Sequence, residues 1–204
     1  VDAAALVGED RITRSALLAQ LRNDRAHLDA NLAAWTVDPL DGPQVMVLNL
    51  EALQPIATPE QGRQMVARWN AIGPWFDGFG ERLQTSAAAG RVSVRSTVEK
   101  AIDTLTGTLA HPDADLSLLA PLAVEHPDWS PADLAAFHDG LRAAVRDVVR
   151  PAMERYLAVL RDDILPISRS GDEPGLSHID GGGEAYGRGR RRWLLAAHGP
   201  RQGR

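Results

Sequence analysis

The sequence contains no cysteine, and this absence excludes several classes of site. Disulfide bonds, Cys-ligated zinc sites and iron–sulfur clusters all need cysteine sulfur, so this chain builds none of them. Phe, Trp and Tyr make up only 5% of the 204 residues, so we expect a core of Leu, Ala and Val. Because Ala, Leu and Arg rank high in helix propensity, the composition favours an all-α fold.

Long apolar runs are also missing. No stretch approaches the roughly 18–20 uncharged apolar residues that a membrane-spanning helix needs, so the sequence predicts no membrane span. The chain begins at Val1, and residues 1–7 lack the basic start of a signal peptide. We expect either a removed leader or a fragment, and the compartment stays open between the cytoplasm and export.

Charge is distributed unevenly along the chain. All 27 acidic residues lie at or before Glu184, whereas six of the 22 basic residues follow it. Residues 1–187 therefore carry a formal charge of −11, from 16 basic and 27 acidic residues, and the remainder carries +6. Since nucleic-acid phosphates need clustered cations, the acidic body argues against a nucleic-acid partner. An RNA-binding tail around Trp193 stays an alternative.

Apolar residues recur at steps of three and four, which predicts a series of amphipathic helices. Residues 36–57 should be irregular, with 45–50 forming either a short strand or one buried helical turn. We predict an irregular all-α bundle of about five to seven helices. The expected helical ranges are 10–35, 58–90 with a kink or break at Gly73-Pro74, 94–110, a short helix near 116–119, and 130–166 with a kink or division at Pro151.

Local signals support several of these boundaries. Thr58 and Gln61 form a capping-box pattern, and Ser130 is a second strong helix start. Gly90 is suited to end a helix, because glycine adopts left-handed backbone angles without a steric penalty. Asp10 is suited to cap the first helix.

The organisation along the chain changes near residue 170. We predict a helical domain over residues 1–170, as the N-terminal part of a larger domain. Residues 171–204 are rich in glycine and arginine and have no apolar period. We therefore expect this tail to be poorly ordered.

The histidines form no recognisable metal motif. None of the six lies four residues from another, so the His-Glu-x-x-His helix of zinc peptidases is absent. His111 with Asp115, or His126 with its acidic neighbours, would make an incomplete site, and a solvated turn is the favoured interpretation of each. Serine elbows and phosphate-binding glycine loops are also missing. We therefore assign no catalytic and no metal-binding residue in this chain.

The segment from Asp38 to Gln44 is the most site-like part of the sequence. Asp38, Asp41 and Gln44 place two carboxylates and an amide within rigid turns. A structural turn is the favoured interpretation, and these three residues are the candidate substrate-side residues. Four tryptophans at helical spacing are interpreted as core rather than as a pocket lining: Trp35, Trp69, Trp75 and Trp129.

Several runs of this chain resemble the N-terminal half of a bacterial family known as domain of unknown function 885. Each run is moderately specific, but their order and spacing agree with the family over residues 15–187. They are residues 27–44 (HLDANLAAWTVDPLDGPQ), 90–102 (GRVSVRSTVEKAI), 149–157 (VRPAMERYL), 164–169 (ILPISR) and 175–186 (GLSHIDGGGEAY).

The resemblance implies a helical zinc metallopeptidase of the gluzincin type. In such relatives the metal helix lies in the C-terminal half, where zinc would polarise a carbonyl and activate water. This chain instead continues past Tyr186 into an arginine-rich stretch, which suggests a frame-shifted or prematurely ended coding sequence. We therefore expect no cofactor in this chain, zinc in the intact family member, and a peptide-like substrate there.

Two functional hypotheses follow from the sequence. The first is the N-terminal helical portion of a zinc-peptidase-like hydrolase that lacks its catalytic half and is inactive alone. The alternative is a helical binding or scaffold protein. The sequence leaves the substrate and the oligomeric state open.

Overall fold

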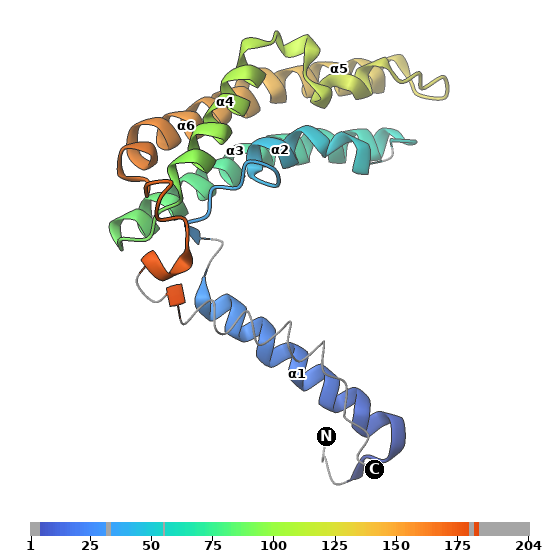
Figure 1. Cartoon of the computed structure of the whole chain (residues 1–204). Helices are drawn as coiled ribbons and strands as arrows, with labels where there is room; N and C mark the ends of the chain where they lie inside the picture. The colour runs from blue at the N-terminus through green and yellow to red at the C-terminus, as the bar shows by residue number, and fades with distance from the viewer. Residues whose placement is uncertain (1–4, 32–33, 55, 180–181, 184–204) are drawn as a thin grey trace. The chain divides into compact units, whose positions relative to one another are not determined.

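The computed structural model describes residues 5–31, 34–54, 56–179 and 182–183 (Figure 1). The chain divides into two compact units, residues 34–173 and residues 1–33 together with 174–204. The division groups residues only by how they pack together. It does not test whether residues 1–170 form one domain, so the predicted boundary after residue 170 stays a prediction. The tail predicted to be poorly ordered covers residues 171–204. Its residues 180–181 and 184–204 lie outside the described residues.

The described part of the chain is helical, which confirms the predicted all-α bundle. It contains no named strand, and its one isolated bridge pairs Val94 with Arg169. The α-helices are α1 (Gly8–Ala30), α2 (Pro43–Met46), α3 (Pro59–Ala88), α4 (Arg95–Ala110), α5 (Pro131–Ala144) and α6 (Arg150–Ala158). The other helical segments are the 3-10 helices η3 (Val47–Asn49), η4 (Glu51–Leu53), η5 (Asp113–Asp115), η6 (Ser117–Ala123), η9 (Leu165–Ile167) and η10 (Leu176–His178), and the π-helices η7 (Val145–Val149) and η8 (Val159–Ile164).

Helix α1 is shorter than the predicted range of 10–35. It ends where Asn31 adopts a left-handed conformation (φ 47°) and donates its backbone N–H to the Leu28 carbonyl. Asparagine tolerates this conformation better than most residues, and the sequence analysis overlooked that signal. The prediction that Asp10 caps α1 is wrong, because Val7 occupies the cap position and Asp10 lies in the first turn.

The start of α3 confirms the predicted capping box. Thr58 Oγ1 accepts a hydrogen bond from the Gln61 backbone N–H at 3.3 Å, and Gln61 Oε1 accepts one from the Thr58 N–H at 3.2 Å. These bonds satisfy two backbone donors that the first turn would otherwise leave free.

Of the kink or break predicted at Gly73-Pro74, the break is wrong, since α3 continues through both residues, and the kink stays a prediction. Pro74 lacks only one helical hydrogen bond, and its side chain is exposed. Buried residues on both sides of it, Trp69 and Phe76, belong to the same core. Packing on both halves of α3 therefore accounts for its continuity.

The end of α3 confirms Gly90 as its terminator. Gly90 has φ +75° and donates its N–H to the Ala87 carbonyl at 2.9 Å. Arg91 donates to the Ser86 carbonyl, also at 2.9 Å, which completes a Schellman motif.

Of the kink or division predicted at Pro151, the division of the helix that begins at Pro131 is wrong, and the kink stays a prediction. Helical structure runs from α5 through η7, α6 and η8 to Ile164. The π-helix η7 ends just before Arg150 and Pro151, where its wider turn accommodates a residue that has no backbone N–H to donate. Pro166 follows in η9, close to the predicted end.

The two short segments between the long helices are helical. Residues 45–49 form the end of α2 and η3, and Leu50 caps η3, so the helical-turn alternative is confirmed and the strand is wrong. The helix expected near 116–119 is η6. Within the described residues, no helix is both long and apolar enough to cross a membrane.

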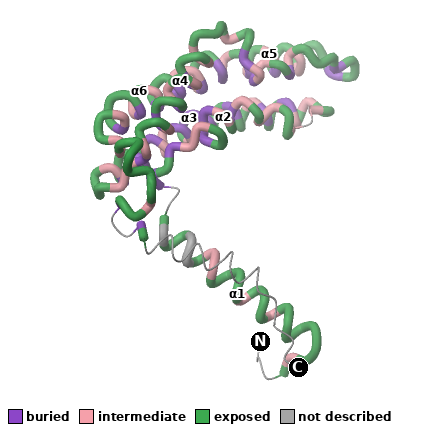
Figure 2. The backbone as a smooth tube through the Cα atoms, viewed as in Figure 1, coloured by how far each residue is buried: buried purple, intermediate pink, exposed green. Residues whose placement is uncertain are grey.

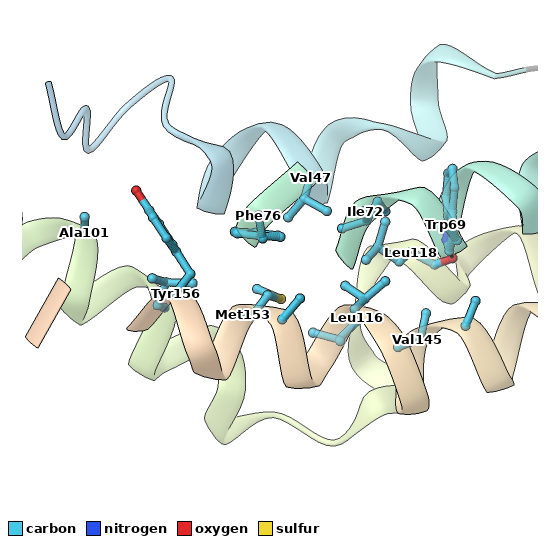
Figure 3. Close-up of a cluster of buried hydrophobic side chains, with 14 of the residues drawn as sticks. Val47, Trp69, Ile72, Phe76, Ala101, Leu116, Leu118, Val145, Met153 and Tyr156 are labelled. Carbon is cyan, nitrogen blue, oxygen red and sulfur yellow. The ribbon is translucent and has the colours of Figure 1, made fainter. Parts of the chain in front are cut away.

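The main core lies within residues 37–164 and joins α3 to α4, α5 and α6. Figure 3 shows part of it, with labelled side chains from α3, α4 and α6. Trp69 and Phe76 are 0% exposed, and Trp69 Nε1 donates to the Leu118 carbonyl at 3.1 Å. Trp35 and Trp129 are also buried, and Trp75 packs against Phe76 at a ring distance of 5.4 Å. The interpretation of the tryptophans as core residues is therefore confirmed.

Candidate functional site

The loop that leads into α2 holds the three candidate residues in a tight turn. Asp38 Oδ1 accepts hydrogen bonds from the backbone N–H groups of Leu40, at 2.8 Å, and Asp41, at 3.0 Å. An aspartate that bonds the backbone two and three residues ahead fixes a turn locally. The Asp38 carboxylate is therefore used, at least through one oxygen, to build the loop.

Gln44 closes the same turn from the inside. It is 0% exposed, and its Nε2 donates to the Asp38 carbonyl at 2.7 Å. A Cβ atom at Gly42 would lie 2.2 Å from the Asp38 carbonyl oxygen and 2.5 Å from Gln44 Oε1. Only glycine fits this close approach.

The structure thus brings the three candidates together in different settings. Gln44 is buried, Asp38 is half-buried and Asp41 is exposed. Of the three, the exposed Asp41 carboxylate is the group most accessible to a ligand, while Gln44 and Asp38 hold the turn that carries it. Their assignment as substrate-side residues stays a prediction.

The loop after α4 contains a second group of polar residues. His111 and Asp115 line an open cavity of about 530 Å³ that also includes Thr108 and Ser117. Ser117 Oγ donates to the Leu48 carbonyl at 2.6 Å, which ties this loop to η3. The two residues that the sequence paired as an incomplete site therefore share one cavity wall.

Arg150, which the sequence analysis did not single out, holds this loop in place. Its Nε donates to Asp113 Oδ1 at 2.5 Å, while Nη1 and Nη2 donate to the carbonyls of Leu109, at 2.9 Å, and His111, at 2.5 Å. A cation at carbonyls near a helix C-terminus is favourable. No local sequence pattern could have revealed this role of Arg150, because its partner Asp113 lies 37 residues away in the sequence.

The described residues do not fit a zinc ion. They include no group of three or more His, Asp or Glu residues placed to hold a metal. His126 instead stacks on Trp129 with a ring distance of 4.1 Å and an interplanar angle of 16°. The zinc expected in the intact family member stays a prediction.

A third polar site lies between α3 and α6, where a cavity of about 350 Å³ is lined by Asp77, Arg155 and Tyr156. Arg155 donates through Nε and Nη2 to the two Asp77 carboxylate oxygens, both at 2.9 Å, and this pairing raises the pKa of Arg155. Burial raises the pKa of the Tyr156 phenol, and the nearby Arg82 opposes this only partly. Tyr156 therefore stays protonated at neutral pH.

The sequence as a whole matches one protein family. The match covers residues 1–202, and the family is described as bacterial protein of unknown function (DUF885). The chain belongs to this family. The DUF885 match includes the arginine-rich stretch after Tyr186, and the frame shift suggested there stays a prediction. Comparisons with curated proteins and with solved structures find no match.

Proposed function

We propose that this DUF885 chain forms the N-terminal helical wall of a zinc-peptidase-like hydrolase. The metal ligands belong to a further segment of the intact protein, and the chain is inactive without it. The observation that carries the proposal is the ordered series of family-like runs between residues 27 and 186, together with the DUF885 match.

The rigid turn before α2 supports a role on the substrate side. Gln44 and Gly42 lock the turn, so the backbone that carries the exposed Asp41 side chain is held in place. A side chain on a fixed backbone loses less conformational entropy when it binds a substrate N–H or ammonium group than one on a mobile loop. In this proposal Asp41 orients the peptide-like substrate, while the chain itself transfers no proton and binds no metal.

Zinc content and peptide hydrolysis test the proposal directly. The 204-residue chain is compared with the same chain joined, after residue 186, to the C-terminal half of a longer DUF885 protein. We expect no stoichiometric zinc and no hydrolysis by the chain alone, and both in the joined protein. Tight zinc binding and chelator-sensitive hydrolysis by the chain alone would overturn the proposal.

The role of Asp41 is tested in the joined protein. Asp41→Asn should lower kcat/KM about tenfold through KM, because it removes a charged partner of the substrate. Asp139→Asn, an equivalent change at an exposed position of α5, is the matched control and should leave kcat/KM unchanged. Equal kcat/KM values for the two variants would remove Asp41 from the site.

The alternative of a binding or scaffold protein predicts a different outcome. The joined protein would then fold cooperatively but bind no zinc and hydrolyse no peptide. Such a result would favour the alternative.

A further inference from the structure

Residues 35–37 lead directly into the turn before α2, and a serine from a distant part of the sequence holds them. Ser93 lies in the connection between α3 and α4. Its Oγ atom donates to the Trp35 carbonyl at 2.6 Å and accepts a hydrogen bond from the Val37 N–H at 2.7 Å. These bonds span 58 and 56 residues of sequence, so they join segments that local turn chemistry does not bring together.

Both hydrogen bonds lie in the interior. Ser93 is 3% exposed, and Trp35 and Val37 are 7% and 2% exposed. A buried backbone N–H or carbonyl is costly to leave without a partner, so the Ser93 hydroxyl satisfies two groups that have little access to water. One side chain therefore fixes the backbone on both sides of Thr36.

The backbone that carries this hydroxyl is itself held. The Ser93 carbonyl accepts the Arg169 N–H at 3.0 Å, and the Arg169 carbonyl accepts the Arg95 N–H at 2.9 Å. These bonds belong to the isolated bridge between Val94 and Arg169. The Arg169 guanidinium adds a bond from Nε to the Val92 carbonyl at 2.9 Å. Ser93 is thus a fixed point to which residues 35–37 are attached.

This attachment supplies what the turn itself lacks. Asp38 Oδ1 and Gln44 Nε2 bond inside the turn, so they set its shape. Asp38 directly follows Val37, so the bond from Val37 to Ser93 sets the direction in which the turn leaves the core. The place of Asp41 relative to the core therefore depends on Ser93.

We propose that Ser93 is a positioning residue for substrate recognition by Asp41. This inference rests on the proposed substrate-side role of Asp41. Ser93 touches no substrate and acts only by holding residues 35–37. It thereby places the Asp41 carboxylate where it meets the N–H or ammonium group of the substrate in the joined protein.

Amide hydrogen exchange of the 204-residue chain tests the attachment. Ser93→Ala removes the acceptor of the Val37 N–H, so exchange at Val37 should become at least about tenfold faster relative to exchange at Trp69 in α3. The Trp69 amide reports global stability, so this ratio isolates the local effect. Ser93→Cys keeps a weaker hydrogen-bonding group and should give an intermediate ratio.

A second buried serine provides the matched control. Ser86 in α3 is 8% exposed, and within the described residues its side chain makes no hydrogen bond to residues 35–37. Ser86→Ala should leave the ratio of the Val37 and Trp69 exchange rates unchanged. Equal ratios in Ser93→Ala and Ser86→Ala would overturn the attachment and the proposal with it.

Kinetics of the joined protein test the positioning. Ser93→Ala should raise KM about fivefold and leave kcat and the zinc content unchanged, because a displaced carboxylate binds substrate less well. In the Asp41→Asn background the same change should have no further effect on KM, because Ser93 acts through Asp41. A serine with a merely structural role would change KM equally in both backgrounds, and that result would overturn the proposal.

The two failures are distinguishable. If the unmodified joined protein hydrolyses no peptide, the proposed function fails, and the positioning of substrate by Ser93 fails with it, whatever the exchange at Val37. If that protein is active and Ser93→Ala leaves KM unchanged, only the inference about Ser93 fails.

Discussion

Helices α1 and α3 look alike in sequence and differ in what they bury. They are the two longest helices of the described chain, with 23 and 30 residues, and both have apolar residues at helical spacing. Trp69 and Phe76 of α3 are 0% exposed, whereas Leu21 and Leu28 of α1 are 53% and 75% exposed. Figure 2 shows buried residues along α3 and mainly exposed ones along α1. The apolar period therefore predicts a helix, but it does not predict which side chains become core.

The difference follows from what each helix has to pack against. Helix α3 lies against α5 and α6, where Gly73 allows Val148 to approach and Gly62 allows Trp129 to approach. Helix α1 belongs to the other compact unit, and the contacts that the described residues show for it include local ones, such as the Gln20–Asp24 hydrogen bond at 2.8 Å. Such pairs contribute only about 0.2–0.5 kcal/mol each to a helix. Stability should therefore depend on α3 far more than on α1.

The largest expected effect comes from removing one core side chain. Trp69→Ala should lower the free energy of unfolding by about 3–5 kcal/mol, because it leaves a cavity and an unpaired Leu118 carbonyl. Leu21→Ala in α1 is the control and should cost no more than about 0.5 kcal/mol. Urea unfolding of both variants measures the difference, and similar losses would break the comparison between the helices.

Glycine substitutions within α3 should show how closely it packs. A Cβ at Gly73 would lie 2.8 Å from Val148 Cγ1, so Gly73→Ala should cost about 1–3 kcal/mol through overpacking. A Cβ at Gly78 meets nothing within 4 Å, so Gly78→Ala should instead add about 0.5–1 kcal/mol. Thermal unfolding checks both signs. A stabilising Gly73→Ala would show that α3 and η7 are not in close contact.

The helix caps provide a smaller contrast. Thr58→Ala removes the capping hydrogen bond to Gln61 and should cost about 1 kcal/mol. The side chain of Val7 makes no capping bond, so Val7→Ala should change the free energy of unfolding very little. Chemical denaturation of the two variants compares the helix starts, and an equal loss in both would contradict the capping argument.

The smallest expected effect is a pH dependence at the start of α3. Hydrogen bonds from Arg63, and then from Gln64, hold the pKa of Glu60 below its ordinary value. A lowered carboxyl pKa contributes stability above the unfolded pKa, about 4.3, and this contribution is lost as the pH falls through the folded pKa. Glu60→Gln should therefore slightly flatten the acid decline of stability, and Glu154→Gln should not. If the free energy of unfolding falls as steeply with acid in Glu60→Gln as in the unmodified chain, the stabilising role of the Glu60 carboxylate is contradicted.

Local chemistry made much of the fold predictable. Thr58, Ser130 and Gly90 mark helix ends through their own side chains or backbone freedom, and the structure places helix ends beside each of them. Continuity through Pro74 and the π-helix before Pro151 were not predictable, because packing between helices that are distant in sequence outweighs the local effect of proline.

The candidate loop was predictable only in part. The turn formed by Asp38 and Gly42 follows from residue types that favour turns. The burial of Gln44 and the anchoring of the 109–113 loop by Arg150 depend on contacts across the fold, which no local pattern encodes. Sequence reasoning therefore finds the turn but not which of its side chains remains accessible.

Amide hydrogen exchange on the full chain tests most directly the claim that α3 anchors the core while α1 does not. The account predicts that amides of α3 around Trp69 exchange only through global unfolding, whereas α1 amides around Leu21 exchange through local opening at least about a hundredfold faster. Equal protection of the two helices, rising together with global stability, would contradict it.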